Sequence, residues 1–177
     1  MLRFLGNWQA LTAIAAMVTA LGAFASVGFI FHQTRQQRKF AAFWELYREW
    51  DSPQMRAHRR RAAALLQRKD LMTNHELVTA DVDVVLDFFD TVAMLLRRRV
   101  LDKQLVWHQF YDWAVYYWFA SEGYVRSVQS DESRTTWKDI QSLVPTLMKH
   151  EGQSRPPRDE KLQEFLASET AGAAVTS

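Results

Sequence analysis

The sequence contains no cysteine and little glycine or proline, six and four residues respectively in a chain of 177. Without cysteine the protein has no disulfide framework, no thiolate nucleophile and no cysteine-based zinc site. The phosphate, dinucleotide, serine-hydrolase and zinc-protease motifs G-x-x-x-x-G-K-S/T, G-x-G-x-x-G, G-x-S-x-G and H-E-x-x-H are also absent. From these absences we expect a non-catalytic protein, with no catalytic residues, no metal and no cofactor.

Charge is missing from a long N-terminal stretch. Between Arg3 and Arg35 no residue is charged, and the run from Trp8 to Phe31, WQALTAIAAMVTALGAFASVGFIF, has only scattered Gln, Thr and Ser. A helix needs about 20 such residues to cross a bilayer, so the run predicts a transmembrane span with Trp8 at the interface. The alternatives are a cleaved signal peptide, for which AFA at 23–25 is an acceptable site, and a buried soluble helix.

Basic residues crowd one flank of this predicted span. Arg35, Arg38 and Lys39 follow it, whereas on the other side Arg3 and the amino terminus are the basic groups. Positive flanks stay cytoplasmic. We therefore expect a single-pass protein of the cell inner membrane, with its N-terminus outside, its C-terminal domain in the cytoplasm and these three side chains near anionic headgroups.

The rest of the chain shows helical periodicity and no strand-like alternation. Apolar side chains recur at three- and four-residue spacings in four segments, at about 40–50, 53–69, 82–96 and 137–148. An aromatic helix is expected between the last two of them. The predicted fold class is therefore all-α, with a transmembrane helix that continues into a cytoplasmic bundle of about four helices.

Three parts are predicted from these patterns. Residues 1–34 form the membrane anchor, 35–150 the helical bundle and 151–177 a flexible tail. The tail has two adjacent prolines and a small polar end, with one short helix expected at about 160–167.

Local signals mark several helix ends. Ser52 is expected to cap a helix that begins at Pro53, because proline suits the first helical turn. Asp102 should cap the aromatic helix. Pro145 should kink or interrupt the last helix of the bundle.

Three aspartates, Asp83, Asp87 and Asp90, lie on one strip of the helix at 82–96. A di-metal or acid–base site would suit such a strip, but a di-iron bundle also needs Glu-x-x-His pairs, which the chain lacks. The simpler interpretation is that the strip faces the basic helix at 53–69 or is merely solvated. Its expected partners there are Arg56, Arg59 or Arg60.

The five histidines lie in separate segments without metal-ligand spacing. Surface or packing roles are favoured for them over catalysis. One of them, His108, is followed by Asp112 at i+4. An enzyme that uses this pair, or the aspartate strip with a metal, is kept as an alternative.

The segment 107–119, WHQFYDWAVYYWF, has eight aromatic side chains in thirteen positions. At about 100° per residue most of its bulky side chains fall on one broad side of a helix. A second membrane crossing is disfavoured because Asp112 would sit in mid-span, and base stacking because no Lys or Arg lies between Lys103 and Arg126. We expect a core helix whose edge also offers a surface to a partner or to lipid, formed by Trp107, Tyr111 and Trp118.

Basic residues are concentrated in the part of the chain that follows the predicted span. Residues 33–80 carry ten Lys and Arg against five Asp and Glu. The chain also has two arginine triplets, at 59–61 and 97–99, which could bind the phosphates of nucleic acid, but acidic residues are interspersed and the membrane is close by. The expected partners are membrane lipids and another protein or a second copy of the chain, and not nucleic acid.

Several features occur in a fixed order along the chain: an N-terminal span, a basic exit, FWELYREWDSPQMRAHRR, and then VLDFFDTVAMLLRRRVLDKQLVWHQFYDWAVYYW. Over about residues 8–150 this order resembles an uncharacterised bacterial family, a domain of unknown function in small single-pass membrane-anchored helical proteins. The resemblance implies location and architecture. It implies no activity and supplies no catalytic residues.

Taken together, the sequence favours a membrane-anchored helical binding or assembly module, as an oligomer or as an accessory subunit of a membrane complex. A membrane-disrupting or channel-forming effector is the first alternative. The enzyme with a His/Asp or carboxylate–metal site is the second.

Overall fold

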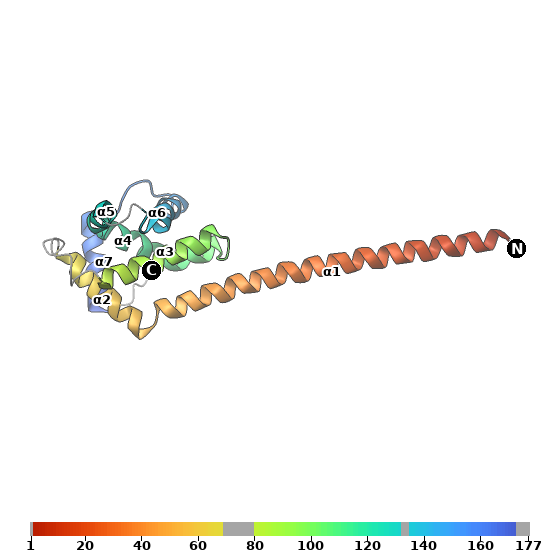
Figure 1. Ribbon diagram of the computed structural model, residues 1–177, viewed down its shortest axis with the longest axis horizontal. Coiled ribbons are helices and arrows are strands. Elements are labelled where there is room, and N and C mark those ends of the chain that lie inside the picture. The colour runs from red at the N-terminus through yellow and green to blue at the C-terminus, as the bar shows by residue number, and fades with distance from the viewer. Residues whose placement is uncertain (1, 69–79, 132–134, 173–177) are drawn as a thin grey trace. The chain divides into compact units, whose positions relative to one another are not determined.

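The computed structural model describes the backbone of residues 2–68, 80–131 and 135–172. Within these ranges the chain forms seven α-helices and no β-strand (Figure 1). They are α1 (Leu2–Trp50), α2 (Pro53–Gln67), α3 (Ala80–Arg97), α4 (Lys103–Ala120), α5 (Glu122–Asp131), α6 (Lys138–His150) and α7 (Asp159–Ala171). The predicted all-α class is confirmed.

The chain divides into two units, Met1–Phe40 and Ala41–Ser177. The first unit holds the N-terminal part of α1. Among the residues that the structure describes, no helix has the length and apolarity that crossing a membrane requires. Most side chains of the predicted span, Trp8 to Phe31, lie outside the described residues.

The second unit is a helical bundle in which α2 packs against α3 and α7, and α6 packs against α3 and α4.

Two helices of this unit begin at the capping residues that the sequence predicted. α1 ends at Trp50, and the Ser52 Oγ accepts a hydrogen bond from the Met55 backbone N–H at 3.1 Å, with Pro53 in the first turn of α2. The Asp102 carboxylate accepts hydrogen bonds from two backbone N–H groups in the first turn of α4. Both predicted caps are confirmed.

Trp50, the last residue of α1, lies in the middle of an aromatic core. Its side chain is 1% exposed, and its ring centroid lies 4.8 Å from those of Phe88 and Phe89 in α3. Phe110 of α4 lies at 6.2 Å. Aromatic pairs in this range contribute about 0.5–1.5 kcal/mol each beyond the area they bury, so these rings hold three helices together.

Asp90 of α3 caps α6 from a neighbouring helix. Its Oδ1 accepts hydrogen bonds from the backbone N–H groups of Asp139 and Ile140, both at 2.9 Å. Trp137, which precedes α6, has a φ of 55° and makes no side-chain cap. Burial raises the pKa of Asp90, while the two backbone donors act in the opposite direction. Asp90 thus accepts hydrogen bonds from backbone N–H groups that have no partner within the first turn of α6.

The aspartate strip of α3 does not face α2, so the predicted pairing with Arg56, Arg59 or Arg60 is wrong. Asp83 accepts a hydrogen bond from the Tyr124 hydroxyl at 2.7 Å, and Asp87 accepts one from the Trp137 indole at 2.8 Å. These donors come from α5 and from the residue before α6. Asp83 and Asp90 are half-buried beside these neutral donors, and Asp87 is exposed.

α7 lies in the segment that the sequence assigned to a flexible tail. The short helix expected at about 160–167 spans Asp159–Ala171 and packs on α2. Phe165 and Leu166 are buried, and Glu169 is only 3% exposed. The structure therefore makes these residues part of the bundle. Periodicity understated the helix because one of its three buried side chains, Glu169, is a carboxylate and not an apolar group.

Two further differences concern the neighbouring helices. α6 extends from Lys138 to His150 with Pro145 inside it, so the proline does not interrupt the helix. α5 is an added helix that starts directly after Ser121, at the end of α4. Its mixed polar sequence and Gly123 gave no apolar stripe from which to predict it.

Candidate functional site

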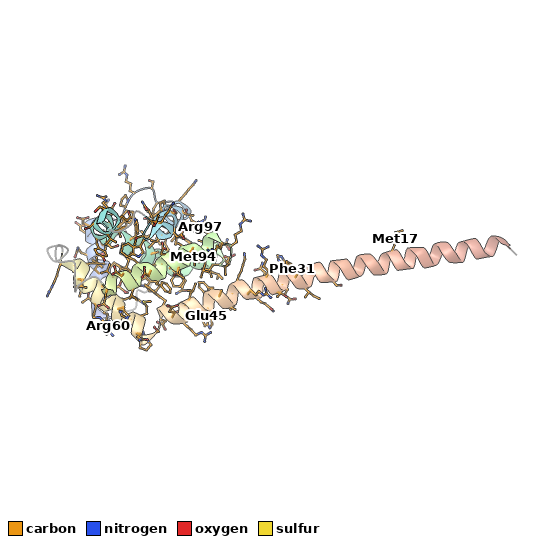
Figure 2. All side chains as sticks on the ribbon, in the orientation of Figure 1. Met17, Phe31, Glu45, Arg60, Met94 and Arg97 are labelled. Carbon is orange, nitrogen blue, oxygen red and sulfur yellow. The ribbon has the colours of Figure 1, made fainter. Side chains whose placement is uncertain are left out.

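The residues predicted to meet the membrane lie in the N-terminal unit. The Trp8 side chain is outside the described residues, whereas Phe31 is 72% exposed (Figure 2). Arg35 and Arg38 are exposed, and Lys39 is half-buried. Their contact with lipid stays a prediction.

The side chains predicted as a partner or lipid surface differ in exposure. Trp118 is buried, and Trp107 and Tyr111 are half-buried. The Trp107 ring packs edge-on against His150 of α6, with 4.8 Å between ring centroids. The Trp107 Nε1 and the Tyr111 hydroxyl are buried and have no hydrogen-bond partner in the described structure. Burial raises the pKa of Tyr111 to about 12.

His108 and Asp112, the pair considered for catalysis, are not hydrogen-bonded to each other in the described part of the chain. His108 is exposed and rests on the Trp107 ring at a centroid separation of 4.5 Å. Burial, and then the charge of Glu151, raises the pKa of Asp112. Among the described residues, no three His, Asp or Glu side chains are grouped closely enough to hold a metal.

Arg59 on α2 and Glu169 on α7 form a buried ion pair. The Arg59 Nε donates to the Glu169 Oε2 at 2.8 Å, and the Nη2 donates to the Oε1 at 2.7 Å. The two side chains are 11% and 2% exposed. Such bidentate pairing is the strongest geometry for an arginine and a carboxylate, but its burial costs desolvation energy unless further hydrogen bonds are made.

Two residues of α4 supply those hydrogen bonds. The Trp113 Nε1 donates to the Glu169 Oε1 at 3.2 Å. The Tyr117 hydroxyl lies 3.0 Å from the Glu169 Oε2 and 3.1 Å from the Arg59 carbonyl oxygen, so its single proton is shared between these two acceptors. Burial, and then the Glu169 charge, holds the pKa of Tyr117 well above its usual value, so the hydroxyl keeps its proton. Glu169 therefore meets four donors, two at each oxygen.

Two indole rings also contact the Arg59 guanidinium. Its Cζ lies 4.4 Å from the ring centroid of Trp50 and 5.0 Å from that of Trp113. Both distances are within the range of a cation–π interaction. Arg59 is thus held by groups from α1, α4 and α7 at once.

A cavity of about 450 Å³ adjoins this network. Its walls come from the end of α1, the start of α2, α4 and the end of α7, and they include Trp50, Arg59, Trp113 and Glu169. Small-molecule sites commonly measure about 300–1,000 Å³ and combine an apolar lining with a few placed polar groups. We call this space the arginine cavity.

Two more arginines of α2, Arg56 and Arg60, line the arginine cavity one helical turn apart. Both are exposed, and in the described part of the chain neither makes a hydrogen bond or an ion pair (Arg60 is marked in Figure 2). The described lining thus contains three arginines against two carboxylates, Asp51 and Glu169. A ligand in the cavity would meet an excess of positive charge.

Two other cavities have a different character. One of about 420 Å³ lies among α2, α4, α5 and α7, and one of about 510 Å³ lies beside Pro145 and the chain that follows α6. Each has a single charged side chain among its described lining residues, Asp159 and Lys149 respectively. The arginine cavity is therefore the stronger candidate for recognising a charged group.

Sequence reasoning did not bring Arg59, Trp113 and Glu169 together. It placed Arg59 opposite α3 and Glu169 in a tail. A usable signal was present: Glu169 follows Phe165 by four residues, so both lie on one helical face. A carboxylate on an apolar face must be paired when that face is buried, and α2 is the most arginine-rich helix.

The comparisons with known proteins identify a family and nothing closer. Neither the curated proteins nor the solved structures include a significant match to this chain. One family matches residues 10–146, and its description is a domain of unknown function. The matched segment contains α2, α3 and α4 whole, with the arginines and indoles of the cavity, but ends before α7. The chain is thus a member of the DUF4760 family.

Proposed function

We propose that the chain is a single-pass, membrane-anchored helical binding module, non-catalytic, that serves as an accessory subunit of a membrane complex. Its C-terminal unit would lie on the cytoplasmic side and carry the recognition site. The observation that carries this proposal is the arginine cavity, a space of about 450 Å³ whose inner wall is fixed by the buried Arg59–Glu169 pair.

The chemistry of the cavity favours binding over catalysis. Glu169 would be the natural base, but each of its oxygens already meets two donors. Arginine stays protonated in proteins and cannot transfer a proton at neutral pH. Neither Glu169 nor the arginines of the lining therefore offer a free proton acceptor, which favours recognition of a ligand over proton transfer.

The proposed anchor has its support in the sequence. The run from Trp8 to Phe31 is long enough to span about 30 Å of hydrocarbon, and the basic residues that follow it favour a cytoplasmic domain. The test is to isolate membranes from expressing cells and treat them with alkaline carbonate. Retention in the pellet, with the C-terminal unit digested only in inside-out vesicles, is expected. Release by carbonate would overturn the anchor.

The binding role is tested on the full chain solubilised in an uncharged detergent. Chemical cross-linking followed by native mass spectrometry should detect a second copy of the chain or a retained partner. A strict monomer with nothing retained would contradict the assembly part of the proposal. Dye leakage from vesicles that contain the protein would favour the membrane-disrupting alternative instead.

A further inference from the structure

We propose that the arginine cavity binds a small phosphate monoester that carries a planar apolar group. This inference rests on the proposed binding function and names the ligand class. The phosphate would be held by Arg56 and Arg60, and the planar group would lie against the aromatic wall of the cavity.

The charge at the mouth of the cavity points to an anion. Arg56 and Arg60 lie on adjacent turns of α2, so their side chains leave the same face of the helix. Neither has a carboxylate partner in the described structure, whereas Arg59 between them is neutralised by Glu169. Pro53, in the first turn of α2, also lines the cavity. The positive end of the helix dipole therefore adds to the charge of the two guanidiniums.

The charge of the two unpaired arginines favours a phosphate over a carboxylate. A carboxylate pairs with one guanidinium through two parallel hydrogen bonds, as Glu169 already does with Arg59. Arg56 and Arg60 together carry two positive charges, whereas a carboxylate carries only one negative charge. A phosphate monoester offers three acceptor oxygens and close to two negative charges, so it can engage both arginines.

The inner wall of the cavity favours a planar apolar group. Trp113 and Tyr47 line the space and are half-buried, so part of each ring is available to a ligand. Trp50 lines it as well, and its buried Nε1 has no hydrogen-bond partner in the described structure. The aromatic rings of this wall therefore suit a planar apolar ring on the ligand.

The test is isothermal titration calorimetry on the full chain in an uncharged detergent. Phenyl phosphate is expected to bind at least about fivefold more tightly than inorganic phosphate, because its ring can stack on an aromatic side chain. It should also bind more tightly than benzoate. Equal affinity for phenyl phosphate and benzoate would overturn the phosphate assignment. Equal affinity for phenyl phosphate and inorganic phosphate would overturn the role of the aromatic wall.

Two double variants test whether the phosphate binds at Arg56 and Arg60. The double variant Arg56→Gln, Arg60→Gln should lose at least about tenfold in affinity for phenyl phosphate, since it removes two charge-assisted pairs. The control Arg98→Gln, Lys103→Gln removes the same charge from exposed residues outside the cavity lining and should bind as the unchanged chain does. An equal loss in both double variants would show a non-specific charge effect and overturn the assignment. Arg56 and Arg60 are exposed, so their replacement should leave folding intact, which circular dichroism verifies.

The phosphate could belong to a soluble metabolite or to a lipid headgroup. A soluble short-chain phosphatidic acid, titrated below its micelle concentration, separates the two. Tighter binding than phenyl phosphate indicates a lipid headgroup, and weaker binding indicates a soluble ester.

If no phosphate ester binds while a protein partner is retained in the cross-linking experiment, the proposed ligand class is wrong and the proposed binding module stands. If neither binds, both proposals fail.

Discussion

Glu169 on α7 accepts two hydrogen bonds, at 2.8 and 2.7 Å, from the guanidinium of Arg59 on α2, which lies 110 residues earlier in the chain. This contact fastens the C-terminal helix to the bundle. It also sets the inner wall of the arginine cavity, because both side chains line it.

Breaking the pair from one side should be costly. Glu169→Ala leaves the Arg59 charge buried without a partner, and we expect a loss of about 3–5 kcal/mol in the free energy of unfolding, measured with urea. Replacing both residues, as Arg59→Met with Glu169→Leu, should recover most of that loss because no charge is then stranded. The exposed pair Arg126–Glu122 provides the control. Glu122→Ala should cost less than about 1 kcal/mol.

Two tyrosines of α4 should respond oppositely to the same substitution. Tyr117→Phe removes the hydroxyl that contacts Glu169 and the Arg59 carbonyl, and we expect it to destabilise the fold by about 1–2 kcal/mol. Tyr111→Phe removes a buried hydroxyl that has no partner in the described structure, so it should be neutral or stabilising. Thermal unfolding of the two variants side by side measures the difference. A comparable loss in both would show that the Tyr111 hydroxyl has a partner.

The cap that Asp90 makes for α6 should depend on its acceptor oxygen. Asp90→Ala removes the acceptor for two backbone N–H groups and should cost about 0.5–2 kcal/mol of unfolding free energy. Asp90→Asn keeps an acceptor oxygen and should recover most of that loss. Local hydrogen exchange at the first turn of α6 should rise in the Ala variant alone. Faster exchange in both variants would mean that the charge, and not the acceptor, is what matters.

Asp81 should make stability depend on pH in the acid range. The hydrogen bonds from Arg61 lower the pKa of Asp81, with a smaller contribution from His58 and against a cost of burial. A carboxyl whose pKa is lower in the folded state adds stability above its unfolded pKa and loses it as the pH falls through the folded pKa. The unfolding free energy of the unchanged chain should therefore exceed that of Asp81→Asn at neutral pH, and the gap should close below about pH 4. A gap that is constant from neutral to acid pH would contradict this.

Those parts of the fold that rest on local chemistry could be predicted from the sequence. Ser52 and Asp102 cap helices where their positions before a helical stripe indicated, because a cap depends only on neighbours in the chain. The partners of the three aspartates of α3 could not be predicted this way. Asp83, Asp87 and Asp90 had charged partners available in α2 but pair with neutral donors, since tertiary packing turns their face toward α5 and α6.

The candidate site was harder still to predict, because its parts come from four helices. The segment 107–119 was expected to form a core helix, and the ring of Trp113 in it does pack against that of Trp50, with a centroid separation of 5.6 Å. That the same rings contact Arg59 depends on α7, whose packing was not predicted. A short helix whose buried face includes a carboxylate has too few regularly spaced apolar residues for its packing to be recognised from the sequence.

The most direct test of the binding site is a titration of the indole N–H signals by two-dimensional nuclear magnetic resonance, with phenyl phosphate added to the full chain in an uncharged detergent. Trp50 and Trp113 line the arginine cavity, whereas the Trp137 Nε1 is hydrogen-bonded to Asp87 and lies outside its lining. The account predicts saturable shifts of the Trp50 and Trp113 signals and none for Trp137. Saturable shifts of Trp137 with unchanged Trp50 and Trp113 signals, or no shifts at all, would contradict it.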